Sequence, residues 1–192
     1  MTVLPTPPGR LLTVAEFAAL GEDDQCRWEL QEGNLTLSPS PTPRHVRASG
    51  RLLIQLDPQM PDDVCVLQDI DIDLQLTAPS RPGWVRRPDL VLVTKRAMDR
   101  VEREGGLLRA DEIQLVIEIV SPGSRRIDRV VKRGEYADAG IPRYWIVDLD
   151  EPASLLPLHQ AGELGYANDH EATGTFTTTA PYPLTINLND LT

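Results

Sequence analysis

Apolar residues recur along this chain with two different periods, and the period of two predicts most of the strands. Residues 64–76 alternate between aliphatic and acidic or amide side chains, which predicts one long strand with a face in water. Three predominantly apolar segments, at 88–93, 113–120 and 144–147, predict buried strands. The residues after 147 contain short apolar segments between glycines and threonines, which is typical of short strands and turns.

Helix signals separate these strands. Thr13 and Glu16 have the spacing of a capping box, which predicts a short helix through Leu20. Thr42, followed by a proline, predicts the start of a second helix with a broad apolar face. The segment 125–139 predicts a third helix, because a glycine and then a proline follow it closely.

The remaining local signal is a hairpin, with strands at 27–31 and 35–38 joined through a Gly-Asn turn. Residues 1–12, rich in proline, are expected to form a flexible tail. Residues 13–192 contain no repeat and no long linker, which predicts a single domain. Strands mixed with helices in this order predict an α+β (or α/β) fold, with a central mixed β-sheet flanked by helices.

Charge is unevenly distributed along the chain. The formal net charge is −10, which excludes a protein coated in basic residues that wraps nucleic acid. Residues 81–133, however, hold 13 basic and 8 acidic residues, so any nucleic-acid contact is expected on one face only. Only Lys95 and Lys132 among the 19 basic residues are lysines, and a lysine that stands where arginine is the rule suggests a chemical role.

Several classes of site and location are disfavoured by what the chain lacks. Cys26 and Cys65 are far apart and belong to no zinc-ligand spacing. No apolar run is long enough for a membrane span, and the N-terminus lacks a signal pattern. We therefore expect a cytoplasmic protein with reduced thiols and no membrane association.

Two of the predicted buried strands each carry one carboxylate, Asp89 and Glu118. Burying a carboxylate in an apolar strand costs on the order of several kcal/mol of folding free energy, unless the carboxylate is paired or binds a metal. If the two strands are neighbours, the carboxylates can converge on one divalent cation, and oxygen ligands favour Mg²⁺ or Mn²⁺. Alternatively, each carboxylate caps a turn or pairs with a nearby arginine.

The predicted helix 125–139 carries Asp128, Lys132 and Tyr136 at four-residue spacing, so these side chains share one face. Asp128 and Lys132 can be read as an ordinary helical ion pair. The position of the helix supports a second interpretation, because it directly follows the strand of Glu118 and its first turns can face the carboxylates.

These residues also carry a family resemblance, over about residues 11–150. The chain resembles the Uma family of restriction endonucleases, within the PD-(D/E)XK nuclease-like superfamily. The motifs that carry the resemblance are Pro88-Asp89, Glu118-Ile119-Val120-Ser121-Pro122, the series Asp128, Lys132, Tyr136 and Gly140-Ile141-Pro142, and Tyr144-Trp145-Ile146-Val147-Asp148. Further matches are Trp28-Glu29-Leu30 with Gly33, and Ser38-Pro39 with His45.

The resemblance implies a restriction-endonuclease-like core with an acidic metal site. Asp89 takes the place of the superfamily's motif aspartate and Glu118 that of its second acid. The chain departs from the pattern at Val120, where the superfamily usually has lysine. The resemblance then implies that Lys132, from the following helix, supplies the missing cation.

Further roles also follow from the resemblance. Glu29 would be an additional acid, His45 an auxiliary group in a first helical turn, and the Ile119 carbonyl a third ligand of Mg²⁺ or Mn²⁺. The lysine would position or help deprotonate the attacking water. Phosphate contacts are expected from arginines near these elements: Arg86, Arg87, Arg125, Arg126 and Arg129.

The sequence thus favours a metal-dependent endonuclease acting on DNA, and a homodimer is compatible with cutting both strands. Two other interpretations remain. One is a catalytically inactive protein of the nuclease fold that acts as a binding or assembly module. The other is a small-molecule hydrolase that uses the same two carboxylates.

Overall fold

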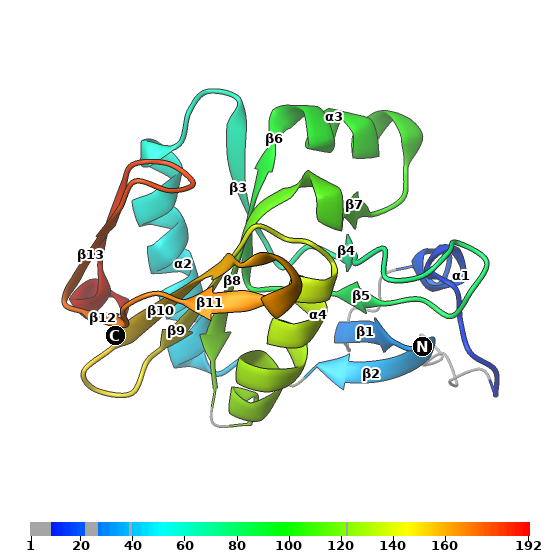
Figure 1. Ribbon diagram of the computed structural model, residues 1–192, viewed down its shortest axis with the longest axis horizontal. Coiled ribbons are helices and arrows are strands. Elements are labelled where there is room, and N and C mark those ends of the chain that lie inside the picture. The colour runs from blue at the N-terminus through cyan, green and yellow to red at the C-terminus, as the bar shows by residue number, and fades with distance from the viewer. Residues whose placement is uncertain (1–8, 22–26, 39, 122) are drawn as a thin grey trace.

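A mixed sheet forms the centre of the computed structural model, which describes residues 9–21, 27–38, 40–121 and 123–192. Its strands run in the order β11-β10-β9-β8-β6-β3, and β12 pairs with β10 (Figure 1). The bounds are β3 (Val64–Gln68), β6 (Leu90–Thr94), β8 (Ile113–Val120), β9 (Arg143–Asp148), β10 (Ser154–Gln160), β11 (Tyr166–Asn168) and β12 (Ala172–Thr173).

One pair in this sheet, β8 with β9, is parallel, and the other pairs are antiparallel. A parallel pair needs a crossover connection, and here it is helical. The crossover begins with a π-helical segment, η3 (Ile127–Lys132), and continues as α4 (Arg133–Asp138). The expected helix at 125–139 is therefore present, but it is wound more loosely over its first half than the sequence pattern predicts.

Both faces of the central sheet are covered, which explains why most residues of β8 are apolar and buried. Helix α2 (Pro43–Leu56) covers one face, where Leu52 and Leu56 pack in the same core as strand residues such as Leu92 and Ile117. The hairpin β13 (Thr175–Thr178) and β14 (Leu184–Asn187), with η5 (Leu188–Leu191), packs on the same side. Helices α3 (Lys95–Glu104) and α4 cover the other face.

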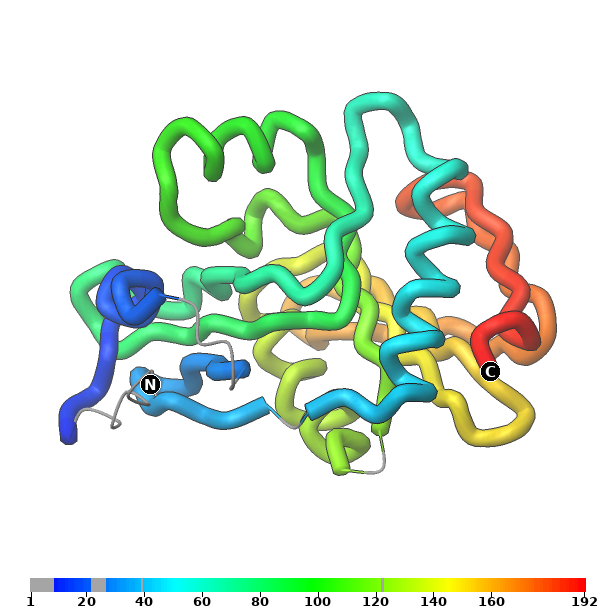
Figure 2. Tube along the Cα trace, turned by 180° about the vertical axis from the view of Figure 1, so that it is seen from behind, coloured from blue at the N-terminus to red at the C-terminus, as the bar shows by residue number. Residues whose placement is uncertain are grey.

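A second sheet lies at the end of the molecule opposite the β13–β14 hairpin (Figures 1 and 2). Its strand order is β2-β1-β5-β4-β7. Helix α1 (Val14–Ala18) packs on it through a small apolar core that includes Phe17 and Leu30. The bounds of its strands are β1 (Arg27–Gln31), β2 (Asn34–Ser38), β4 (Ile72–Asp73), β5 (Val85–Arg86) and β7 (Leu108–Arg109). Elsewhere along the chain there are short 3₁₀ turns at η1 (Asp57–Gln59), η2 (Ala110–Glu112) and η4 (Gly162–Leu164).

The expectation of one long strand over 64–76 is wrong. The chain turns at Asp69, which has a φ of 51°. The residues before the turn join the central sheet as β3, and those after it join the second sheet as β4. The alternating pattern is real on both sides of the turn, but a pattern of period two carries no information about which sheet each half enters.

Other local predictions are confirmed. Thr13 and Glu16 form the capping box of α1, and Thr42 caps α2 with a proline in its first turn. The 27–38 hairpin forms, but it turns through Glu32 and Gly33, both at positive φ, rather than through the expected Gly-Asn pair, and Asn34 belongs to β2. The mixed fold of strands and helices is as expected.

The first residues differ in part from the expected tail. Residues 1–8 and Cys26 lie outside the described residues, whereas Leu12 is buried with Leu30 against α1. Among the described residues, no helix has the length and apolar content needed to cross a bilayer.

Candidate active site

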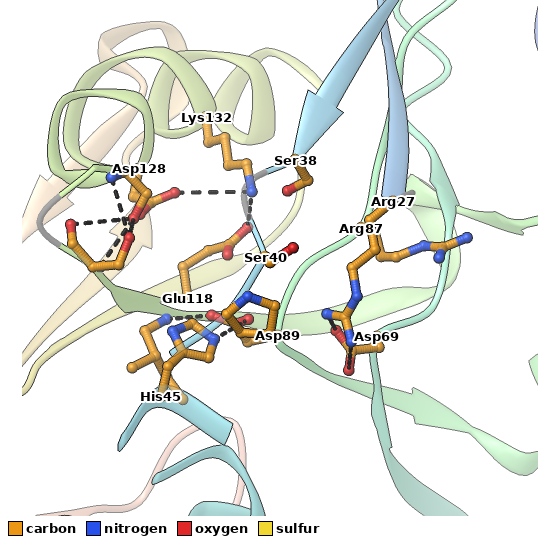
Figure 3. Close-up of a pocket in the computed structure, with 14 residues that line it drawn as sticks. Arg27, Ser38, Ser40, His45, Asp69, Arg87, Asp89, Glu118, Asp128 and Lys132 are labelled. Carbon is orange, nitrogen blue, oxygen red and sulfur yellow. Dashed lines mark hydrogen bonds and ion pairs between the residues drawn. The ribbon is translucent and has the colours of Figure 1, made fainter. Parts of the chain in front are cut away.

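Two carboxylates, Asp89 and Glu118, meet where β6 and β8 run side by side in opposite directions. The ladder pairs Leu90 with Ile117, and its continuation by one residue places Asp89 opposite Glu118. The Asp89 Oδ2 accepts a hydrogen bond from the backbone N–H of Ile119 at 2.6 Å, which ties the aspartate to β8. Both carboxylates line one cleft (Figure 3), as expected of neighbouring strands.

Glu118 is held through one of its two oxygens. The side chains of Lys132 and Tyr136 each donate a hydrogen bond to Glu118 Oε1 at 2.8 Å. Its Oε2 accepts no hydrogen bond from the residues that the structure describes, although Glu118 is only 3% exposed. Burial, together with the nearby charges of Asp89 and Asp128, raises the pKa of Glu118 well above its ordinary value despite Lys132.

Lys132 lies among three carboxylates. Its Nζ is 2.8 Å from Glu118, 3.3 Å from Glu29 and 3.8 Å from Asp128. Burial alone would lower the pKa of Lys132, but these negative charges raise it above its ordinary value. Lys132 is therefore a protonated donor and a fixed positive charge, rather than a base.

The helical crossover positions Lys132. Asp128 and Lys132 both lie in the π-helical segment η3, and Tyr136 lies one turn later in α4. Single π-helical turns are rare and occur frequently at functional sites. The sequence pattern correctly put the three side chains on one face, but it assigned no contact to Tyr136 and gave no sign of the π turn.

Glu29 connects this cluster to a buried arginine. Its Oε2 accepts a hydrogen bond from Arg86 at 2.9 Å, and its Oε1 accepts one from the backbone N–H of Arg87 at 3.0 Å. Arg86 also donates two hydrogen bonds to Glu135. Burial alone would raise the pKa of Glu29, but the positive charges of Lys132 and Arg86 lower it overall.

This environment changes the interpretation of Arg86. Its side chain is 2% exposed, and its guanidinium is bonded to two carboxylates. A phosphate could not reach it without a rearrangement of the core. We therefore assign Arg86 to the internal support of Glu29, and not to nucleic-acid contact.

His45 reaches Asp89 from the first turn of α2. Its Nε2 lies 2.7 Å from Asp89 Oδ1, so both oxygens of Asp89 have a partner. Burial would lower the pKa of His45, but the hydrogen bond to Asp89 raises it overall. The other ring nitrogen, Nδ1, is buried and has no partner among the described residues, which favours the tautomer that carries its proton on Nε2.

The other expected phosphate contacts are mostly engaged by acids. Arg125 and Arg129 both pair with Asp148. Arg87 lines the cleft and pairs with a nearby aspartate. Arg126 is exposed and forms no ion pair with a residue that the structure describes. The positive charge of this segment is thus largely neutralised locally.

The residues present fit a small, hydrated cation better than an organic ligand. The cleft encloses about 60 Å³, far below the several hundred Å³ typical of sites for organic ligands. Among the described residues, no group of three or more His, Cys, Asp and Glu side chains has metal-ligand spacing. Two carboxylates with water and substrate oxygens are, however, the usual ligands of Mg²⁺.

Charge supports the same fit. Lys132 lies within 4 Å of three carboxylates, and Asp89 lines the same cleft, so the cleft holds more negative charge than Lys132 balances. A divalent cation beside Asp89 and the unbonded Oε2 of Glu118 would offset this excess. Ile119, the third expected ligand through its carbonyl, lines the same cleft.

Comparisons with known proteins identify the fold and the family of the chain. A crystal structure of "a putative nuclease belonging to DUF820 from Anabaena variabilis ATCC 29413" has the same fold, with a TM-score of 0.69 and 17% sequence identity over 94% of this chain and 97% of that one. No curated protein matches the chain. Residues 14–177 match the Uma2 family, described as "Putative restriction endonuclease". The chain therefore belongs to the Uma2 family, whose resemblance its motifs had indicated.

Proposed function

We propose that this protein is a metal-dependent endonuclease that hydrolyses phosphodiester bonds in DNA. The observation that carries the proposal is the cluster of Asp89, Glu118 and Lys132 at one cleft, with an oxygen of Glu118 left unbonded among the described residues. Membership in the Uma2 family supports nuclease chemistry. We infer the choice of DNA and the requirement for a metal from the acidic cleft and its neighbouring lysine.

Asp89, Glu118 and the Ile119 carbonyl would hold Mg²⁺ or Mn²⁺. When bound, such a cation would polarise the phosphate and lower the pKa of a coordinated water. Asp89 is already oriented by the Ile119 N–H and by His45, and Glu118 by Lys132 and Tyr136. The carboxylates are therefore pre-positioned, which reduces the reorganisation needed on binding.

Lys132 would act as a charged donor. Its raised pKa keeps it protonated at neutral pH, so it would hydrogen bond a phosphate oxygen or the attacking water and offset developing negative charge. Removal of the proton from the water would then fall to another acceptor. This refines the expectation from the sequence, in which Lys132 could also help deprotonate the water.

A non-catalytic binding module is less well supported. Val120 would favour such a module, because it replaces the strand lysine that the superfamily usually has. The Nζ of Lys132 contacts Glu118 at 2.8 Å, so a cation from the helix is present beside the second acid. The small volume of the cleft likewise disfavours a small-molecule hydrolase.

The proposal can be tested by nicking of supercoiled plasmid DNA with Mg²⁺ or Mn²⁺. Asp89→Asn, Glu118→Gln and Lys132→Met should each lower the rate by about a hundredfold or more, because each removes a charge from the reacting centre. Glu102→Ala, on the exposed surface of α3, serves as the control and should cleave like the wild type. Circular dichroism would verify that each variant is folded.

Calorimetric titration with Mn²⁺ gives an independent measurement. The wild type should bind the ion, and Glu118→Gln should bind it at least tenfold more weakly. If the wild type binds no divalent ion and the three variants cleave DNA as it does, the proposed function is wrong.

A further inference from the structure

Arg27 reaches the candidate active site from the second sheet. It is the first residue of β1 and pairs across the hairpin with Ser38 of β2, and both residues line the cleft. Side chains two residues apart in a strand lie on the same face, so Arg27 shares the face of β1 that carries Glu29. Because Glu29 contacts the buried Lys132, this face of β1 is the one directed at the cleft.

An ion pair with Asp69 holds the guanidinium of Arg27 near the two acids. Its terminal nitrogens donate to the Asp69 carboxylate at 2.5 and 3.2 Å. The backbone N–H of Asp69 in turn donates to the backbone carbonyl of Asp89 at 3.3 Å. Figure 3 shows Asp89 and Glu118 between Lys132 on one side and Asp69 on the other. The acids are thus flanked by two cations, one from η3 and one from β1.

Arg27 is the most accessible of the arginines and lysines that line the cleft. Its side chain is 40% exposed, against 24% for Arg87 and 7% for Lys132. The carboxylate of Asp69 is exposed as well, and an exposed ion pair adds little stability because water screens both charges. A phosphate can therefore replace Asp69 at the guanidinium at small cost, whereas Lys132 is fixed among buried carboxylates.

The volume of the cleft limits what it encloses. The cleft holds about 60 Å³, far below the several hundred Å³ of sites for organic ligands, so it has no room for two nucleotides. If the scissile phosphate lies at Asp89 and Glu118, the neighbouring phosphates of the same strand lie at the mouth, where Arg27 is the exposed cation. A small anion would use one of these two positions, whereas a polynucleotide occupies both, which favours a nucleic acid.

We propose that Arg27 binds a phosphate next to the scissile one, and that its guanidinium passes from Asp69 to this phosphate when the substrate enters. The inference rests on the proposed function, and it adds a substrate-binding residue. A guanidinium binds a phosphate through two parallel hydrogen bonds, as it binds a carboxylate. Such a contact fixes the register of the strand without reading its sequence. In the free protein, Asp69 keeps the guanidinium at the mouth of the cleft.

The test compares two substrates with Mn²⁺: a labelled DNA duplex, and bis(4-nitrophenyl) phosphate, which has a single phosphate. Arg27→Met should raise the KM for the duplex about tenfold, because one charge-assisted contact is lost, and should change kcat by less than about threefold. Its effect on kcat/KM for the small diester should be less than about twofold. Arg27→Lys, which keeps the charge, should recover part of the affinity for the duplex.

Two outcomes of this comparison would overturn the proposal. A KM for the duplex that stays at the wild-type value would mean that Arg27 contacts no phosphate. An equal loss on both substrates would mean that Arg27 supports the shape of the cleft or the scissile phosphate, and not a neighbouring one. Circular dichroism would verify that each variant is folded.

Asp69→Asn gives the opposite prediction. Asparagine tolerates the positive φ of this position, so the turn should be kept. The KM for the duplex should fall about threefold, because the guanidinium loses its competing carboxylate, and the fall should be absent in the Arg27→Met background. A rise in KM, or a fall that persists without Arg27, would overturn the exchange between Asp69 and phosphate.

The matched controls are Arg103→Met and Glu104→Gln, which change the net charge by the same amounts. These two residues form an exposed pair on α3 and do not line the cleft. Each control should stay within about twofold of the wild type on both substrates. Shifts as large as those of Arg27→Met and Asp69→Asn would overturn the proposal, because net charge alone would then explain them.

Binding of the same duplex in EDTA at low salt, followed by fluorescence anisotropy, separates this proposal from the proposed function. If the wild type cleaves neither substrate, but Arg27→Met weakens binding about tenfold and Arg103→Met does not, only the proposed function fails. If the wild type cleaves the duplex and Arg27→Met behaves like Arg103→Met, only the Arg27 proposal fails. If the wild type neither cleaves nor binds the duplex, both are wrong.

Discussion

Replacement of Arg86 by methionine should reduce the stability of the folded protein strongly. The Arg86 side chain is 2% exposed, and its partners Glu29 and Glu135 are 6% and 12% exposed. Methionine fills a similar volume but leaves both carboxylates without their shared cation. Removing one member of a buried ion pair costs about 3–5 kcal/mol, because the remaining charge is buried without compensation.

A loss of that size is a large fraction of total stability, since domains unfold with about 5–15 kcal/mol. Urea denaturation followed by circular dichroism would measure the free energy of unfolding and the m-value together. The matched control is Arg27→Met, which removes an arginine whose pair with Asp69 is 40% and 43% exposed. An exposed pair of this kind should contribute about 0–1 kcal/mol.

The result also separates two roles for Arg86. If Arg86→Met unfolds with a free energy within about 1 kcal/mol of the Arg27→Met value, the inferred internal role is refuted. A stable Arg86→Met variant with weakened DNA affinity would instead restore the phosphate contact that the sequence had indicated.

Three further predictions follow from single contacts. Tyr136→Phe removes a donor to the buried Glu118 and should lower the free energy of unfolding by about 1.5–3 kcal/mol in urea denaturation, and a change below about 0.5 kcal/mol would contradict the contact's importance. Glu29→Gln should destabilise the protein most at pH 7. The pKa of folded Glu29 lies below its ordinary value of 4.5, so the stabilisation from its charge is present above pH 4.5 and is lost as pH falls through the folded pKa. The urea unfolding curves of variant and wild type should therefore converge between pH 7, 5 and 4, and a constant difference would contradict this. Gly83→Ala should lower the free energy of unfolding by about 1–3 kcal/mol, because the new Cβ would lie 2.5 Å from a side-chain carbon and 3.0 Å from a backbone nitrogen of α1. Gly134→Ala, where α4 leaves open space, should be neutral or stabilising by up to about 1 kcal/mol. Urea denaturation compares the two variants.

The sequence predicted which residues belong to the candidate site better than it predicted the contacts between them. Asp89 and Glu118 stood out because a carboxylate is costly in an apolar strand. Lys132 stood out because the chain uses arginine almost everywhere else.

What the sequence by itself determined is the local structure: the capping box of α1, the Thr42 cap of α2, the 27–38 hairpin and the buried run of β8. These signals act between residues a few positions apart, so they do not depend on which distant segments become neighbours in the folded protein.

Only the tertiary structure decided which charges meet. The turn at Asp69 sends one alternating segment into two sheets, and Arg86, 57 residues from Glu29, pairs with it inside the core. The energy of a buried ion pair depends on the strands that happen to enclose it, and those strands come from distant parts of the chain. For this reason the sequence predicted Arg86 to be a phosphate ligand, whereas in the folded protein it is a buried partner of Glu29 and Glu135.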